Sequence, residues 1–209
     1  SCSKLEVYEE PVIRSFILSQ IQLVASKMDS RDMAECSEAL ARIKLYSHEL
    51  AAAVEYELVH YPWSFGLPGL MKLLPHFSTW GLGLTQKKAF QTLGKFIAEQ
   101  AEYLSSEDSL IAVKTFTDVG SVHEILLQTL FLRLLLERSF TDLSPEHLAQ
   151  LIVAMSRVQH YHTGLLREIV VYLEENPDVV KAWSSKEVSG CLRTFGLAPV
   201  PIRKPLQRL

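Results

Sequence analysis

The sequence predicts an all-α protein, specifically an α-solenoid of antiparallel helical hairpins with a repeat of about 38 residues. The main observation is an internal match, because residues 144–173 align with residues 29–58 at a shift of 115 positions without a gap. The aligned pairs are Leu148 with Met33, Ala154 with Ala39, Arg157 with Arg42, Tyr161 with Tyr46 and Leu165 with Leu50. The alternation of apolar and polar residues that is typical of β-strands is absent.

Two weaker copies of the unit are predicted between the matched segments. A shift of 38 places six apolar residues of the third unit on the template: Leu110, Val113, Phe116, Leu127, Phe131 and Leu135. The second unit contains Leu70, Leu73, Phe77 and Trp80 and needs a gap. The predicted organisation is a partial leading unit (1–28), a hairpin array (29–198, with units at about 29–66, 67–105, 106–143, 144–184 and a partial 185–198) and an extended basic tail (199–209).

The elements of the first half follow from helix start and stop signals. Pro11 fits the first turn of a helix that continues with period 3.6 to Met28. Asp29 or Ser30 is expected to cap the next helix, and after a turn at Tyr46 a second helix is expected over residues 48–60. Proline and glycine then interrupt the pattern, and the following helix is expected from about residue 85 to residue 103.

The second half has clearer signals. Ser105 or Ser106 starts a helix with acidic residues in its first turn, and Gly120 marks a turn. Ser144 precedes a proline at the first helical position. A short extra turn is expected over residues 179–183, and Ser185 is expected to cap the last helix. Each hairpin is apolar on both sides, so stacking of neighbouring units is needed to bury it.

Composition limits the class of protein. Of 209 residues 48% are apolar and the net charge is −3, so no global field favours nucleic acid or an anionic membrane. Three cysteines without CxxC spacing indicate free thiols in a reducing compartment. The longest apolar run, residues 125–136, is too short for a membrane span and is expected to be a buried helix. The chain opens with Ser1 rather than Met, which is compatible with a removed targeting segment.

Catalytic patterns are incomplete, so the sequence does not predict an enzyme. His48 and Glu49 begin a zinc-peptidase pattern that fails at Ala52. His160 and His162 would point apart on a helix and lack a supporting ligand nearby. Phosphate-binding loops and serine-nucleophile elbows do not occur in the sequence. No cofactor and no metal are therefore expected.

Two segments carry a resemblance to a known group of families. EALARIKLYSHEL from Glu38 and VAMSRVQHYHTGL from Val153 share an alanine-centred first helix and a turn tyrosine. This pattern resembles the octotricopeptide, heptatricopeptide and FAST-kinase-like repeat proteins. The resemblance implies an organellar protein, mitochondrial or alternatively in a plastid or another reducing compartment, that binds RNA or serves as a ribosomal subunit. The RAP domain that many members carry at the C-terminus does not follow in this sequence.

The expected function is therefore a non-catalytic scaffold or binding subunit of a large organellar assembly, most plausibly a mitochondrial ribosome or related ribonucleoprotein with neighbouring proteins and rRNA as partners. One alternative is a free organellar RNA-binding factor in RNA processing or stability, and another is a protein-only scaffold of a respiratory or ATP synthase complex. Eight cations are candidate phosphate contacts: Arg42, Lys44, Lys114, Arg157, Arg193, Arg203, Lys204 and Arg208.

A solenoid that reads RNA one unit at a time predicts a row of cations at one repeat position. Arg42 and Arg157 are equivalent, but the alignment places Val119 and Leu197 at the same position, so the row is broken. The simpler interpretation is that these arginines are solvated or pair with acids of an adjoining helix.

Overall fold

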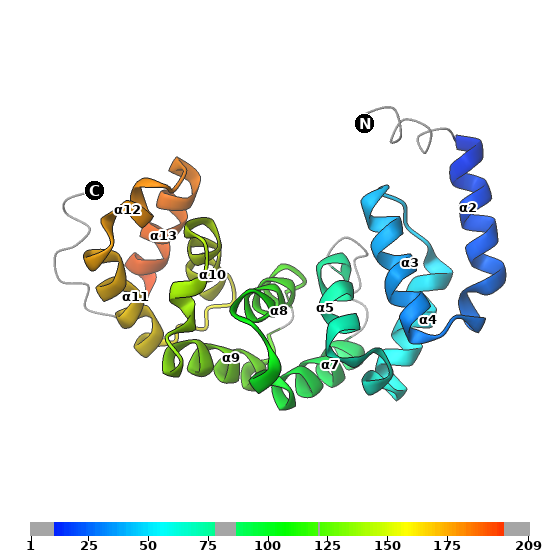
Figure 1. The fold of residues 1–209 in the computed structure, drawn as a ribbon, viewed down its shortest axis with the longest axis horizontal. Coiled ribbons are helices and arrows are strands. Elements are labelled where there is room, and N and C mark those ends of the chain that lie inside the picture. The colour runs from blue at the N-terminus through cyan, green and yellow to red at the C-terminus, as the bar shows by residue number, and fades with distance from the viewer. Residues whose placement is uncertain (1–10, 78–86, 121, 199–209) are drawn as a thin grey trace. The chain divides into compact units, whose positions relative to one another are not determined.

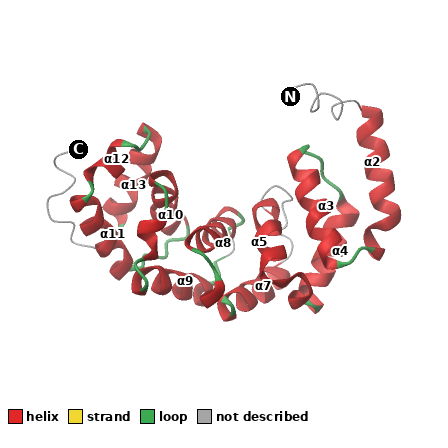
Figure 2. Ribbon diagram, viewed as in Figure 1, coloured by secondary structure: helices red, strands yellow, loops and turns green. Residues whose placement is uncertain are grey.

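The computed structural model describes residues 11–77, 87–120 and 122–198, and all regular structure in these ranges is helical (Figures 1 and 2). The all-α prediction is confirmed for this part of the chain, which contains eleven α-helices and no strand. None of its helices is long and apolar enough to cross a membrane. The predicted tail at 199–209 and Trp80 lie outside the described residues. The chain divides into two compact units, Ser1–Phe96 and Ile97–Leu209.

The first unit is built around α3 and α4. Its elements are α2 (Pro11–Val24), η2 (Ala25–Lys27), α3 (Ser30–Arg42), α4 (His48–His60), η3 (Pro62–Phe65), α5 (Gly66–Phe77) and α7 (Lys87–Glu99), of which α7 crosses the boundary between the units. Helix α3 packs against both α4 and α5, and α2 packs against α4. The core between them contains fully buried side chains such as Leu50, Val54, Leu70 and Phe77.

The second unit contains two rows of helices. Its elements are η4 (Ala101–Tyr103), α8 (Ser106–Asp118), α9 (Glu124–Leu136), η5 (Ser139–Asp142), α10 (Pro145–Arg157), α11 (Thr163–Glu175), α12 (Pro177–Lys181) and α13 (Ser185–Leu197). Helix α10 lies between α8 and α13, while α11 packs against α9. Phe116, Phe131, Phe140, Leu151 and Met155 fill the space between the rows.

Polar side chains fix where the helices begin. Asp29, Ser105, Ser144 and Ser184 each accept a hydrogen bond from the backbone N–H three residues later, at 2.8, 3.0, 3.2 and 3.4 Å. The predicted cap Ser185 is wrong by one residue, because it is the first residue of α13 itself. Its neighbour Ser184 forms the cap, and the Ser184 backbone N–H donates in return to the Glu187 carboxylate at 2.6 Å, which completes a capping box.

The shift of 115 positions also relates the helix bounds, since α3 and α4 coincide with α10 and α11 at both ends. The turn residues Lys44 and Gln159 are related in the same way and have φ of 51° and 52°. Helices α8 and α9, however, precede α10 and α11 by 39 residues, not by 38. The predicted alignment of the third unit is therefore wrong by one position, and buried Phe116 corresponds to Met155 instead of Ala154.

Helix α9 differs from its prediction as a wholly buried helix. Leu127, Leu130 and Phe131 are buried, but Ile125 and Leu136 are 68% and 74% exposed. Leu132, which lies on the same side seven residues after Ile125, is also exposed. This apolar stripe therefore faces outward, because only one side of α9 meets α8 and α11.

Candidate functional site

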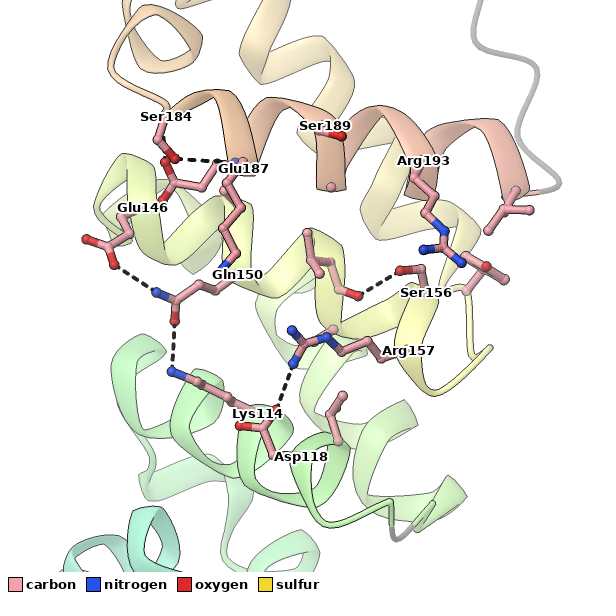
Figure 3. Close-up of a pocket in the computed structure, with 18 of the residues that line it drawn as sticks. Lys114, Asp118, Glu146, Gln150, Ser156, Arg157, Ser184, Glu187, Ser189 and Arg193 are labelled. Atoms are coloured by element: carbon pink, nitrogen blue, oxygen red, sulfur yellow. Dashed lines mark hydrogen bonds and ion pairs between the residues drawn. The ribbon is translucent and has the colours of Figure 1, made fainter. Parts of the chain in front are cut away.

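A hollow of about 1050 Å³ opens over α8, α10 and α13 in the second unit (Figure 3). Its residues recur at i, i+3 and i+4 along each helix, so each helix contributes one face. The polar members of the lining are Lys114, Thr117, Asp118, Glu146, Gln150, Ser156, Arg157, Gln159, Tyr161, Ser184, Lys186, Glu187, Ser189 and Arg193. Charged and polar side chains are thus interspersed with small apolar ones, and the hollow differs from the predominantly apolar cavities that hold small-molecule ligands.

An ion pair joins α8 to α10 on this face. The Arg157 guanidinium donates to the Asp118 carboxylate at 2.7 Å (Figure 3). With the 39-residue relation between the helices, Asp118 and Arg157 occupy the same repeat position. An acid and a base at one position of stacked helices neutralise each other, so this position does not present a row of cations.

Gln150 extends the hydrogen bonding along the same face. Its side-chain carbonyl accepts from Lys114 of α8 at 3.4 Å, and its amide donates to Glu146 at 3.0 Å. Figure 3 shows Lys114, Gln150 and Glu146 joined by these two successive hydrogen bonds, which extend from α8 to α10. The arrangement leaves the Lys114 ammonium with further donor capacity toward the hollow, because one long hydrogen bond uses only one of its three N–H groups.

Helix α13 supplies the less constrained cations. Glu187 is held by the N-terminus of the helix, and the hydrogen bond from the Ser184 backbone is the main cause that lowers its pKa. Lys186 and Arg193 are exposed, and neither makes a hydrogen bond or ion pair with the described residues. In Figure 3 Arg193 and Arg157 extend into the hollow from neighbouring helices. The α13 side therefore carries positive charge that a ligand can meet.

The floor of the hollow consists of small residues. A Cβ atom added at Gly190 would lie 2.8 Å from Cγ2 of Val153, so only glycine allows this approach of α13 to α10. Beneath it the Cys191 thiol lies 3.9 Å from the Ala149 carbonyl oxygen. Burial raises the pKa of Cys191 to about 12, with a smaller contribution from Glu187. The thiol is therefore protonated and unreactive near neutral pH.

The side chains on this face that could take part in chemistry are mostly held by their own helices. The Cys191 thiol is buried, Ser184 caps α13 and Asp118 pairs with Arg157, and no cluster of three metal-ligating side chains occurs within the described ranges. His162 caps α11 by accepting from the Leu165 backbone at 3.1 Å, and burial lowers its pKa. The groups that remain on this face offer charge and hydrogen bonds to a polar ligand.

The eight cations predicted from the sequence fall into three groups. Lys114, Arg157 and Arg193 are brought together in the hollow. Arg42 and Lys44 belong to the first unit, where Arg42 pairs with Glu38 of its own helix at 2.5 Å and the Lys44 carbonyl accepts from Arg14 at 2.9 Å. Arg203, Lys204 and Arg208 lie outside the described residues.

Sequence reasoning missed Asp118, Glu146, Gln150 and Lys186. The signal for Asp118 was present, because a spacing of 39 instead of 38 places it opposite Arg157. The pairing of arginine with an acid of the adjoining helix holds for Arg157, while Arg42 pairs within its own helix.

A scan against models of known protein families and a search of curated protein sequences found no match to this chain.

Proposed function

We propose that the chain is a non-catalytic α-solenoid that acts as a binding subunit of a larger assembly. The helical-hairpin repeat is supported by the equal bounds of α3–α4 and α10–α11, by the caps at equivalent positions and by the left-handed residue after each first helix. Units of this kind stack through their first and second helices separately, in agreement with the contacts of α10 with α8 and α13 and of α11 with α9.

The observation that carries the proposal is the hollow on the α8–α10–α13 row. It is wide, polar and lined by cations with remaining donor capacity, namely Lys114, Lys186 and Arg193. Faces formed by successive repeats are the surfaces that helical-repeat proteins use for binding. The partner at this face is therefore an extended polar chain with acidic groups.

A second surface supports assembly with neighbouring proteins. The stripe of Ile125, Leu132 and Leu136 on α9 is exposed, whereas the corresponding positions on α11 carry Gly164, Val171 and Glu175. Because α11 carries a glycine at the position of Ile125 and a glutamate at the position of Leu136, the hairpin does not require large aliphatic side chains at these positions. Exposed apolar stripes of this kind mark protein contacts.

The resemblance of the two repeat segments to organellar repeat proteins extends the proposal to a mitochondrial ribosome or related ribonucleoprotein. The free RNA-reading factor is disfavoured, because Asp118 occupies the repeat position of Arg157 and cancels its charge. The net charge of −3 also disfavours RNA binding by the free protein, because it gives no overall attraction to phosphate groups.

Sedimentation of the tagged protein from mitochondrial lysate tests this function. We expect it to co-sediment with a particle of ribosomal size and to shift to lighter fractions after RNase treatment. A position unchanged by RNase would favour a protein-only scaffold. Migration as a single chain, together with steeply salt-dependent RNA binding by the purified protein, would favour the free RNA factor and contradict the proposal.

Variants connect the result to the hollow. The double substitution Lys186→Glu and Arg193→Glu reverses both free cations on α13, and we expect it to reduce co-sedimentation at least fivefold. Lys27→Glu reverses an exposed cation in η2 and serves as the control. Equal co-sedimentation of both variants would show that the hollow does not hold the partner.

A further inference from the structure

Four aromatic side chains form an exposed patch at the end of α4 and in η3. Tyr56, Tyr61 and Trp63 are 58%, 47% and 63% exposed, and His60 is exposed between them. The Tyr56 and His60 rings are stacked with centroids 4.3 Å apart, and the centroids of His60 and Tyr61 are 6.2 Å apart. Tyr61 and Trp63 meet edge to face at 5.9 Å and 86°. We call these four residues the aromatic patch.

The repeated hairpin does not require these rings. At the shift of 115 the counterparts of Tyr56, His60, Tyr61 and Trp63 are Val171, Glu175, Asn176 and Asp178. Helix α11 there has the same bounds as α4, and none of the four equivalent positions carries an aromatic side chain. The exposed apolar area of the patch is thus additional to what folding needs, and contiguous area of this kind marks an interaction site.

The polar ends of the rings are available to a ligand. The hydroxyls of Tyr56 and Tyr61 and the indole N–H of Trp63 make no hydrogen bond with the described residues. His60 is held in place, because its Nδ1–H donates to the Tyr56 carbonyl at 2.8 Å. The patch therefore combines apolar ring surfaces with three outward donors, which suits a ligand that offers apolar rings and backbone carbonyls.

The local charge distinguishes between two ligands that stack on aromatic rings. From His48 to Phe65 the segment contains Glu49, Glu55 and Glu57 and no lysine or arginine. On the neighbouring α3, Arg31 and Arg42 are paired with acids of their own helix. A phosphate backbone would be repelled by Glu57, which neighbours Tyr56, whereas a cationic peptide would be attracted.

We propose that the aromatic patch binds a basic, proline-rich peptide in the polyproline II conformation. Proline rings pack on tyrosine and tryptophan surfaces, and the carbonyls of this extended conformation accept hydrogen bonds from indole and phenol groups. Prolines three residues apart are separated by about 9 Å, which the row of rings from Tyr56 to Trp63 can accommodate. Arginine or lysine side chains between the prolines meet Glu57 and the faces of the rings.

Fluorescence anisotropy on the full-length protein tests the proposal. The probe is a labelled twelve-residue peptide of four proline-proline-arginine triplets, and we expect saturable binding. Trp63→Ala and Tyr61→Ala are each expected to weaken it at least tenfold. Tyr103→Ala is the matched control, because Tyr103 is 69% exposed in η4 and its ring stacks on no aromatic ring of the described residues, and it should change affinity less than twofold. Thermal melts establish that all variants remain folded.

Two further peptides separate the contributions of shape and charge. Replacing every proline by serine, or every arginine by glutamate, should weaken binding at least tenfold. Equal binding of the serine peptide would reduce the interaction to ionic attraction and overturn the proposal, as would no binding of the original probe. Trp63-dependent binding of a single-stranded uridine oligonucleotide in place of the peptide would assign the patch to RNA instead. Because the patch belongs to the first unit and the hollow to the second, the Lys186→Glu and Arg193→Glu variant should bind the probe normally.

Discussion

Gly190 shows how one residue sets the packing between two helices. Its hydrogen atom faces Val153 where any side chain would place a carbon at 2.8 Å, so the contact of α10 with α13 depends on the missing Cβ. Glycine inside a helix is unfavourable by about 1 kcal/mol relative to alanine. The sequence shows this cost but does not show the close helix contact that the missing side chain allows. Gly196 in the same helix has no neighbour within 4 Å of an added Cβ.

We therefore expect opposite effects from the same substitution. Gly190→Ala should lower the free energy of unfolding by about 1–3 kcal/mol through overpacking. Gly196→Ala should raise it by roughly 0.5–1 kcal/mol through helix propensity. Urea denaturation measures both. Adding Val153→Ala to Gly190→Ala should recover part of the loss; if it deepens the loss instead, the close contact is not the cause.

Cys191 predicts a pH dependence. Burial raises its pKa to about 12, against about 8.5 for a cysteine in an unfolded chain. A folded pKa above the unfolded value means that the protonated thiol favours the native state fully below about pH 8.5, and that this stability is lost as the pH rises toward 12. Between pH 9 and 10.5 the stability should fall by up to ~1.4 kcal/mol per pH unit from this group.

The measurement is urea denaturation of the wild type and Cys191→Ala across that range. The slopes are compared, since the substitution also removes buried volume. A shallower slope in the variant is expected. Identical slopes would mean that the thiol does not titrate differently in the folded and unfolded chains.

At the scale of one element, α13 illustrates how a helix is started. The Ser184 hydroxyl oxygen accepts from the Glu187 backbone N–H, and the Glu187 carboxylate accepts from the Ser184 backbone N–H at 2.6 Å. This interaction lowers the pKa of Glu187. Its contribution to stability is present above the usual glutamate pKa of about 4.3 and is lost as the pH falls through the lowered folded value.

Ser184→Ala should therefore destabilise the protein by about 1 kcal/mol at neutral pH. The pKa of Glu187, followed by NMR, should rise by the smaller share that the Ser184 hydroxyl contributes, because the backbone N–H of residue 184 still donates to the Glu187 carboxylate. Ser185→Ala is the control, since Ser185 is exposed and is the first helical residue, so a change within about 0.5 kcal/mol is expected. A larger loss for Ser185→Ala than for Ser184→Ala would show that Ser185, and not Ser184, caps the helix.

At the scale of the whole molecule, each of the two units has its own buried core. Leu151 is fully buried in α10, at the centre of the second unit. In repeat architectures stability is a sum of local terms between neighbours, so a defect is felt most strongly nearby.

Leu151→Ala should cost about 2–5 kcal/mol in local stability. Hydrogen exchange of the full-length variant, followed by mass spectrometry, should show the largest loss of protection in α8, α10 and α13. The amides of α3 and α4 should change much less. Equal loss of protection in both units would show that the chain unfolds as one cooperative block.

How far the sequence predicted this protein differs between its segments. Ser144, Pro145 and the helix over residues 48–60 were placed correctly, because capping and helix-starting signals are local and act within a few residues. The third unit was misaligned by one residue, because α9 carries apolar side chains at nearly every position and several registers look alike. Its exposed stripe was missed for the same reason.

The sequence by itself determined that the described chain is helical, where the capped helices begin and that residues 29–58 and 144–173 match, since periodicity and capping depend on near neighbours. Only the tertiary structure decided that Asp118 meets Arg157, that Gly190 meets Val153 and that the rings of Tyr61 and Trp63 face outward. The physical reason is that a helix offers several faces of similar composition, and the choice among them is made by packing against the adjacent helix, which no local pattern encodes.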